Sequence, residues 1–256
     1  MKIAITGGTG RMGVVIREGL AGKYNEVRIL TRHEPEYLLP QEVAVTGNLQ
    51  DLDALRRLLV GVDAVLHLAA VTDESDFETI LEANISGTAN LYAVAREVGV
   101  RRVVYASTNH VIGFYPTETR LDESVPVRPD TFYGVSKVFG EALASLYWDK
   151  WGIESVALRI GAFRERPKEP RQLSIWLSHR DAVDLVRCSL EAPEVGFTIA
   201  YGISANARAW WSLDEAYKLG YAPRDNAEDY AALVQGREYA YQGGGYADPE
   251  YAGGLW

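Results

Sequence analysis

The chain has 256 residues, which is enough for one large domain or two small ones. Its hydrophobic share of 47% and charged share of 24% are ordinary for a soluble globular protein, and no apolar run approaches the length of a membrane span. The formal net charge of -9 argues against a nucleic-acid-binding protein, which needs a basic excess. The single cysteine, Cys188, leaves no internal disulfide, and the start of the chain lacks the pattern of a signal peptide. We therefore expect a cytoplasmic protein with neither nucleic acid nor membrane as a partner.

A glycine-rich turn follows the first predicted strand. Residues 2–6 form a short β-branched run that leads directly into the segment 7–13, Gly-Gly-Thr-Gly-Arg-Met-Gly, and then into a helical pattern. In a dinucleotide-binding unit Gly7 allows the tight turn, Gly10 admits the pyrophosphate and Gly13 lets helix and strand pack closely. A plain tight turn is the alternative interpretation. The cofactor contacts that we predict in this turn are Gly7, Gly10, Arg11, Met12 and Gly13.

The end of the second predicted strand, 27–31, is where a Rossmann fold binds the adenosine ribose. An acidic residue there binds the 2′-hydroxyl of NAD, whereas an arginine suits the 2′-phosphate of NADP. Arg32 stands at this position and Arg11 lies nearby in the turn, so the sequence favours NADP slightly over NAD. Glu34 counts against NADP, and Arg32 as a solvated or adenine-stacking side chain is the alternative. Two further cofactor contacts are expected after the third predicted strand, 43–46: Asn48 and Leu49.

Strand and helix patterns alternate over the first 200 residues, and the strands are near-continuous apolar runs. This pattern predicts an α/β, Rossmann-type, doubly wound parallel sheet in three layers. No linker or repeat divides the chain, so we predict one NAD(P)-binding domain over 1–256. Segments at about 160–180 and 201–256, the latter rich in aromatic residues and glycine, are expected to cover the substrate as a small irregular C-terminal cap. The other predicted elements are strands at 62–68, 103–106, 155–160 and 196–200, and helices at 52–59, 77–98, 132–151 and 181–190.

Tyr133 and Lys137 lie four residues apart in a predicted helix, so their side chains share one face. A phenol beside a cation has a lowered pKa and becomes a usable general base for a substrate hydroxyl. An isolated pair of this kind is usually a surface pair. In a doubly wound sheet, however, the carboxyl ends of the strands meet at one rim, where ligands bind. Ala69 and Ala70, after the fourth strand, leave room for a cofactor at that rim.

Together the glycine turn, a hydroxyl residue after the fifth strand (Thr108) and the Tyr133-x-x-x-Lys137 pair resemble the short-chain dehydrogenase/reductase superfamily, in its extended, epimerase-like branch. Four further segments extend the resemblance over nearly the whole chain, and they are similar to uronate dehydrogenases. These segments are 106–116 (Ala-Ser-Thr-Asn-His-Val-Ile-Gly-Phe-Tyr-Pro), 173–179, 204–206 with Trp210-Trp211, and 242–244 (Gln-Gly-Gly).

This resemblance implies hydride transfer from C1 of a cyclic sugar acid, glucuronate or galacturonate, to NAD(P), with an aldarolactone as product. By the match Tyr133 is the base, Lys137 lowers its pKa and holds the nicotinamide ribose, and Thr108 takes the place of a catalytic serine. Arg171 matches an arginine that clamps the uronate carboxylate; a surface charge in a basic loop is its alternative. The implied substrate contacts are Thr72, Thr108, Asn109, His110, Tyr133 and Arg171. No metal site is expected.

Three departures from the family pattern keep other functions open. Ala162 stands where the family has a substrate-binding serine, and Arg32 and Asn48 each replace an aspartate. Related enzymes oxidise neutral aldoses such as L-arabinose or galactose, often with NADP, and this is the first alternative. A nucleotide-sugar epimerase or dehydratase, or a non-catalytic NAD(P) sensor, is the second. We also expect a homo-oligomer, formed through the long helices or the aromatic tail.

Overall fold

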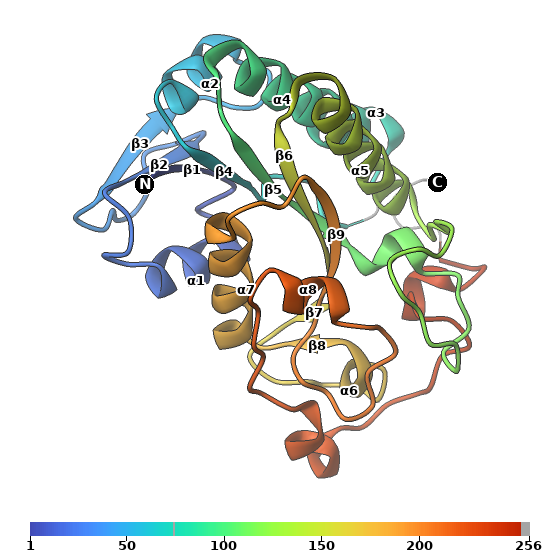
Figure 1. The fold of residues 1–256 in the computed structure, drawn as a ribbon. Helices are drawn as coiled ribbons and strands as arrows, with labels where there is room; N and C mark the ends of the chain where they lie inside the picture. Colours follow the sequence, from blue (N-terminus) through green and yellow to red (C-terminus); the bar gives the residue numbers. More distant parts are fainter. Residues whose placement is uncertain (74, 252–256) are drawn as a thin grey trace.

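The centre of this computed structural model is one sheet of seven parallel strands. The structure describes residues 1–73 and 75–251. The strand order is β3-β2-β1-β4-β5-β6-β9, so the direction of winding reverses between β1 and β4 (Figure 1). This is the doubly wound arrangement predicted from the sequence. The strands are β1 (Lys2–Thr6), β2 (Glu26–Thr31), β3 (Glu42–Thr46), β4 (Ala64–His67), β5 (Arg102–Thr108), β6 (Glu154–Ile160) and β9 (Phe197–Gly202).

Helices cover both faces of the sheet, which gives the three predicted layers (Figure 1). On one face α1 (Arg11–Gly19) packs beside α7 (His179–Glu191). On the other, α4 (Gly87–Val98) lies between α2 (Leu52–Leu59) and α5 (Phe132–Trp151). The smaller elements are α3 (Phe77–Ile80), α6 (Gln172–Ile175), α8 (Asp214–Lys218), the strand pair β7 (Ala162–Phe163) and β8 (Trp176–Leu177), and three 3₁₀ segments at Asn109–Ile112, Ala227–Leu233 and Gly244–Ala247.

The predicted helix at 77–98 is interrupted by a π-helical segment, Leu81–Ser86. Asn84 lies in this segment and is buried. Its amide pairs with both backbone groups of Val71, at 2.8 and 2.9 Å, and donates to Ser136 Oγ at 3.0 Å. π-Helical turns are frequent at functional sites, and here the widened turn is tied to the loop after β4 and to helix α5.

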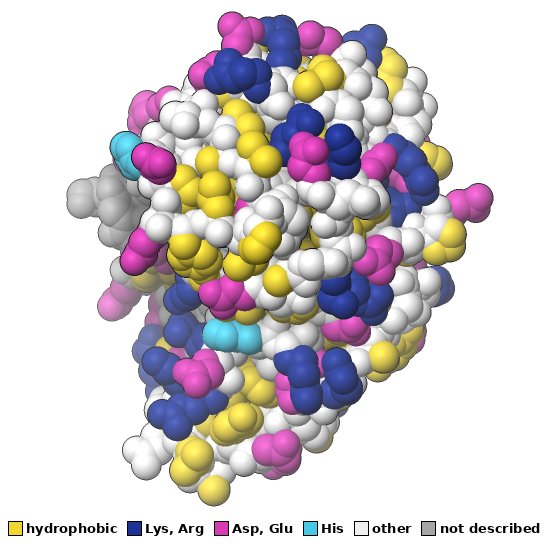
Figure 2. Space-filling view, turned by 90° about the vertical axis from the view of Figure 1, so that its left-hand side faces the viewer, with side chains coloured by type: hydrophobic (Ala, Val, Ile, Leu, Met, Phe, Trp, Pro, Cys, Tyr) yellow, Lys and Arg dark blue, Asp and Glu magenta, His cyan; other side chains and the backbone are white. Residues whose placement is uncertain are grey.

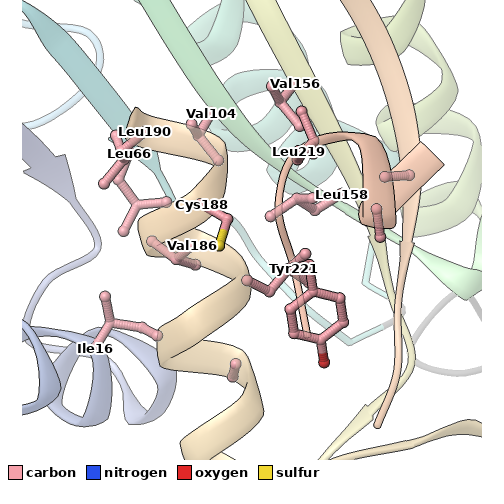
Figure 3. Close-up of a cluster of buried hydrophobic side chains, with 14 of the residues drawn as sticks. Ile16, Leu66, Val104, Val156, Leu158, Val186, Cys188, Leu190, Leu219 and Tyr221 are labelled. Atoms are coloured by element: carbon pink, nitrogen blue, oxygen red, sulfur yellow. The ribbon is translucent and has the colours of Figure 1, made fainter. Parts of the chain in front are cut away.

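A hydrophobic cluster fills the space between the sheet and helices α1, α7 and α8 (Figure 3). Leu66, Val104 and Leu158 project from three neighbouring strands, and Tyr221 reaches the same cluster from the C-terminal segment. Part of the aromatic tail is therefore core. Cys188 lies in this cluster, where burial raises the pKa of its thiol and so disfavours the reactive thiolate.

Acidic and basic side chains are interspersed on the molecular face in Figure 2, with hydrophobic side chains between them. Among the described residues, no helix combines the length and the apolar character that crossing a membrane requires.

Candidate active site

A cavity of about 680 Å³ opens at the carboxyl ends of the strands, within the size range of small-molecule sites. Loops after β1, β4, β5 and β6 line it, together with the first two turns of α5 and part of the C-terminal segment. Most of the residues predicted from the sequence meet here, because parallel strands end at the same edge of the sheet. The predicted residues that line the cavity are Gly7, Gly10, Arg11, Met12, Gly13, Ala69, Ala70, Thr72, Thr108, Asn109, His110, Tyr133, Lys137 and Arg171.

Three predicted cofactor contacts do not line this cavity: Arg32, Asn48 and Leu49. Arg32 is exposed directly after β2. The Asn48 side chain accepts from the backbone N–H of Gln50 at 2.8 Å, and Leu49 packs into the core on the α2 side of the sheet. These residues follow β2 and β3 at the same edge, and the side chains of Asn48 and Leu49 make local contacts there.

The glycine turn has the shape of a phosphate cradle. Gly7 has φ +71°, and a Cβ added there would lie 2.7 Å from the backbone nitrogen of Ala69. A Cβ on Gly13 would overlap the carbonyl oxygen of Gly7. Helix α1 begins directly after Gly10, which has no side chain to cap its free N–H groups. The turn therefore fits the pyrophosphate of a dinucleotide, since those N–H groups and the helix dipole favour an anion.

Helix α5 places Tyr133 and Lys137 on the cavity wall. Thr131 caps the helix by accepting from Gly134 N at 2.9 Å, and a Cβ on Gly134 would lie 2.5 Å from His110 O. A small residue is therefore needed at position 134 so that α5 can approach the end of β5. Tyr133 and Lys137 are 7% and 3% exposed, so both side chains are withdrawn from solvent.

The electrostatics of this pair differ from the sequence-based expectation. Burial raises the pKa of Tyr133 to about 12, against an opposing hydrogen bond with the Thr108 side chain. Lys137 Nζ donates to Ala106 O at 2.7 Å, and burial lowers the pKa of the ammonium to about 7. The expectation of a lowered pKa for Tyr133 is wrong for this structure, because burial disfavours the charged phenolate more than the Thr108 hydrogen bond favours it.

Arg171 is directed into the site and is not a surface charge. Its side chain is 11% exposed, and burial lowers the pKa of the guanidinium. Nε donates to Gln242 O at 2.6 Å. Nη2 donates to Asn109 Oδ1 at 2.9 Å when the Asn109 amide is oriented so that its nitrogen donates to Ile160 O. Within the described chain, the carboxylate nearest to this guanidinium is that of Glu169, at 3.7 Å.

Gln242 anchors the C-terminal segment beside Arg171. Its fully buried amide donates to the carbonyl oxygens of Pro116 and Thr119, at 3.1 and 2.8 Å, and accepts from Trp211 Nε1 at 2.7 Å. Segments 210–211 and 242–244, which both resemble uronate dehydrogenases, are therefore in contact although they lie far apart in the sequence. Gln242 holds the backbone that in turn orients the guanidinium of Arg171.

The structure adds cavity residues that the sequence analysis did not select. Asp73 and Tyr246 both line the cavity, and the Tyr246 hydroxyl donates to Asp73 Oδ1 at 2.8 Å. Phe163 and Arg164 line the cavity after β6. The position of these two residues after a strand is a signal that could have selected them, whereas nothing in the sequence indicated the Asp73–Tyr246 contact.

The fold and the site are those of an enzyme that binds a dinucleotide cofactor. Comparison of the sequence with known protein families identifies the family. Residues 3–174 match the model of the NAD dependent epimerase/dehydratase family, and the chain belongs to this family.

Individual relatives show which enzymes of this family the chain resembles. The chain is 42% identical to a uronate dehydrogenase of Pseudomonas putida, over 96% of this chain and 95% of that protein. It is 37% identical to an L-arabinose 1-dehydrogenase (NAD(P)(+)) of Haloferax volcanii, over 88% and 97%. Its fold matches a mutant uronate dehydrogenase from Agrobacterium tumefaciens complexed with NAD, with a TM-score of 0.91 and 38% identity over 96% and 97% of the two chains. The predicted similarity to uronate dehydrogenases is confirmed.

Replacement of Gln242 by leucine tests the anchor. We expect Gln242→Leu to lower the free energy of unfolding by roughly 2–3 kcal/mol, because two carbonyl groups and one indole N–H lose their partner. Urea denaturation measures this difference. Gln235→Leu, at an exposed position of the same C-terminal segment, is the matched control and should be near neutral. Equal stability of the two variants would contradict the anchoring role.

Proposed function

We propose that this protein oxidises C1 of a cyclic uronate with NAD(P), giving an aldarolactone and the reduced cofactor. The observation that carries the proposal is the buried guanidinium of Arg171 in the same cavity as Tyr133. A planar guanidinium held by neutral oxygens is suited to a bidentate carboxylate, the group that distinguishes a uronate from a neutral aldose. The identity to a uronate dehydrogenase of 42% supports it.

The roles of the site residues follow from what C1 oxidation requires. A hydride leaves C1 and a proton leaves the C1 hydroxyl, so that the C1–O bond becomes a carbonyl. Tyr133 takes the proton in its phenolate form, and Thr108, which hydrogen-bonds it, orients the same substrate oxygen. Asn109 and His110 bind the sugar beside Arg171, and Thr72 binds it from the loop after β4. When bound, the oxidised nicotinamide supplies the hydride acceptor.

The cofactor is held along the other half of the cavity. Gly7, Gly10 and Gly13 admit the pyrophosphate, and Arg11 and Met12 contact it from the first turn of α1. Ala69 and Ala70 leave space for the nicotinamide half, and Lys137 binds its ribose. The backbone of Asn48 and Leu49 contacts the adenine. Arg32 and Arg11 are both exposed near the ribose corner, which supports a slight preference for NADP.

A neutral-aldose 1-dehydrogenase is the second candidate function. Ala162 lines the cavity and offers no hydroxyl to a substrate. The 37% identity to an L-arabinose 1-dehydrogenase supports the same alternative. Both candidates share the reaction and the base, and they differ only in what Arg171 binds.

Initial rates separate the two candidates. We expect wild-type protein to oxidise glucuronate or galacturonate with a kcat/KM at least about 100-fold above arabinose or galactose, each measured with NAD and with NADP. Arg171→Lys should lower kcat/KM for the uronate by about 10- to 100-fold, because a point charge replaces a bidentate fork, and should leave the cofactor KM unchanged. Arg166→Lys, in the same loop but exposed, is the control. Turnover of neutral aldoses alone would overturn the uronate assignment.

We also propose that the protein is a homo-oligomer. Helix α5 exposes several large apolar side chains, an arrangement that a partner subunit would cover. These residues are Phe132, Val135, Leu146, Trp148 and Trp151. Light scattering at micromolar concentration should give at least twice the monomer mass, and a monomer would refute the proposal.

A further inference from the structure

Asp130 lies behind the cavity wall, two residues before the start of α5, and its side chain is 0% exposed. Both carboxylate oxygens face the ring of His110, with Oδ1 and Oδ2 at 3.0 and 2.9 Å from Nδ1. The backbone also links the two residues, because Asp130 N donates to His110 O at 3.2 Å. In the described part of the chain, Asp130 is the residue that hydrogen-bonds the ring of His110.

Two glycines form the slot that holds this carboxylate. A Cβ added to Gly113 or to Gly243 would overlap Asp130 Oδ2. The two glycines are 130 residues apart, and they are joined by a hydrogen bond from Gly243 N to Gly113 O at 2.8 Å. The C-terminal segment therefore completes the slot, and a side chain at either glycine would displace the carboxylate.

This geometry determines which nitrogen of His110 carries a hydrogen. Nδ1 faces two acceptor oxygens, so it is protonated whether the ring is neutral or charged. In the neutral ring Nε2 is then the acceptor. Aromatic contacts restrict rotation of the ring, with Tyr246 at 4.5 Å on one side and Tyr133 at 6.0 Å on another, both measured between ring centroids. His110 lines the cavity next to the proposed base.

We propose that Asp130 is a positioning residue that acts through His110. It fixes the ring with Nδ1 toward the protein, so that Nε2 accepts a hydrogen bond from a substrate hydroxyl beside Tyr133. This inference rests on the proposed function, because the hydroxyl belongs to the sugar that Arg171 binds. The glycine slot makes the position of the ring depend on the docked C-terminal segment, and Gly113, which does not line the cavity, contributes to sugar binding without touching the sugar.

A double-mutant cycle tests whether Asp130 acts through His110. Kinetics of glucuronate oxidation are measured for Asp130→Ala, His110→Ala and the double variant, at saturating cofactor. Each single variant should lower kcat/KM for the sugar by about 10- to 100-fold, because misplaced contacts near the reacting atoms cost about this much. The double variant should match His110→Ala within about twofold, since the two side chains act as one unit. The cofactor KM should not change.

The outcomes separate the inference from the proposed function. Additive losses, or a rise in cofactor KM together with a loss of thermal stability, would show that Asp130 is merely structural and would overturn the inference. If the wild-type protein turns over no uronate, the proposed function fails, and the cycle is measured with the neutral aldose that it oxidises. The same non-additivity is then expected, because His110 would bind a hydroxyl of that sugar too.

A variant of Gly113, the slot glycine that does not line the cavity, tests the slot without removing the carboxylate. Gly113→Ala should reproduce the loss in kcat/KM of Asp130→Ala, because the new methyl group displaces Oδ2. Glu238→Ala, at an exposed position of the C-terminal segment outside the cavity, is the control. It should behave like wild type. Equal kinetics of the two variants would overturn the role of the slot.

Discussion

The contact on which the substrate half of the site depends is the seating of Arg171 between two neutral oxygens. Asn109 Oδ1 and Gln242 O fix the guanidinium through hydrogen bonds of 2.9 and 2.6 Å, and neither oxygen carries a formal charge. A buried cation costs free energy unless an anion or strong dipoles compensate it. The carboxylate of Glu169 forms an ion pair with the guanidinium at 3.7 Å, but burial outweighs it and the pKa of Arg171 stays lowered. The site therefore keeps a cationic position that a substrate carboxylate can complete.

The sheet topology and the C-terminal segment together bring Arg171 into the same cavity as Tyr133. The parallel sheet places the ends of β1, β4, β5 and β6 at one edge. The glycine turn and the 3₁₀ segment after β5 therefore meet there through the sheet topology alone, without specific long-range contacts. The C-terminal segment is different, because it is attached by specific contacts. Gln242 bonds to Trp211 and to two carbonyl groups near residue 117, and Gly243 packs on Asp130. The proposed cofactor half therefore follows from the fold, and the proposed sugar half depends on the C-terminal segment.

Features with a local signature were predictable from the sequence. The glycine turn, the doubly wound parallel sheet implied by alternating elements and the helix carrying Tyr133 are confirmed. Each depends on neighbours within a few residues or on a general rule of sheet topology. The family resemblance located Arg171, but only the structure shows that it is buried. Burial also reversed the expected pKa shift of Tyr133, since desolvation depends on packing that a helical spacing of four residues does not reveal. The partnership of His110 with Asp130 crosses 20 positions without a recognisable pattern, so no reasoning from spacing could find it.

The central claim is that Tyr133 faces C1 of a sugar whose carboxylate is bound by Arg171. The most direct measurement uses glucuronate carrying deuterium at C1, incubated with the wild-type protein and oxidised cofactor. The account predicts that the reduced nicotinamide contains one deuterium at C4 and that a lactone of the aldaric acid forms in equal amount. A reduced cofactor without deuterium would contradict it, because the hydride would then come from a carbon other than C1.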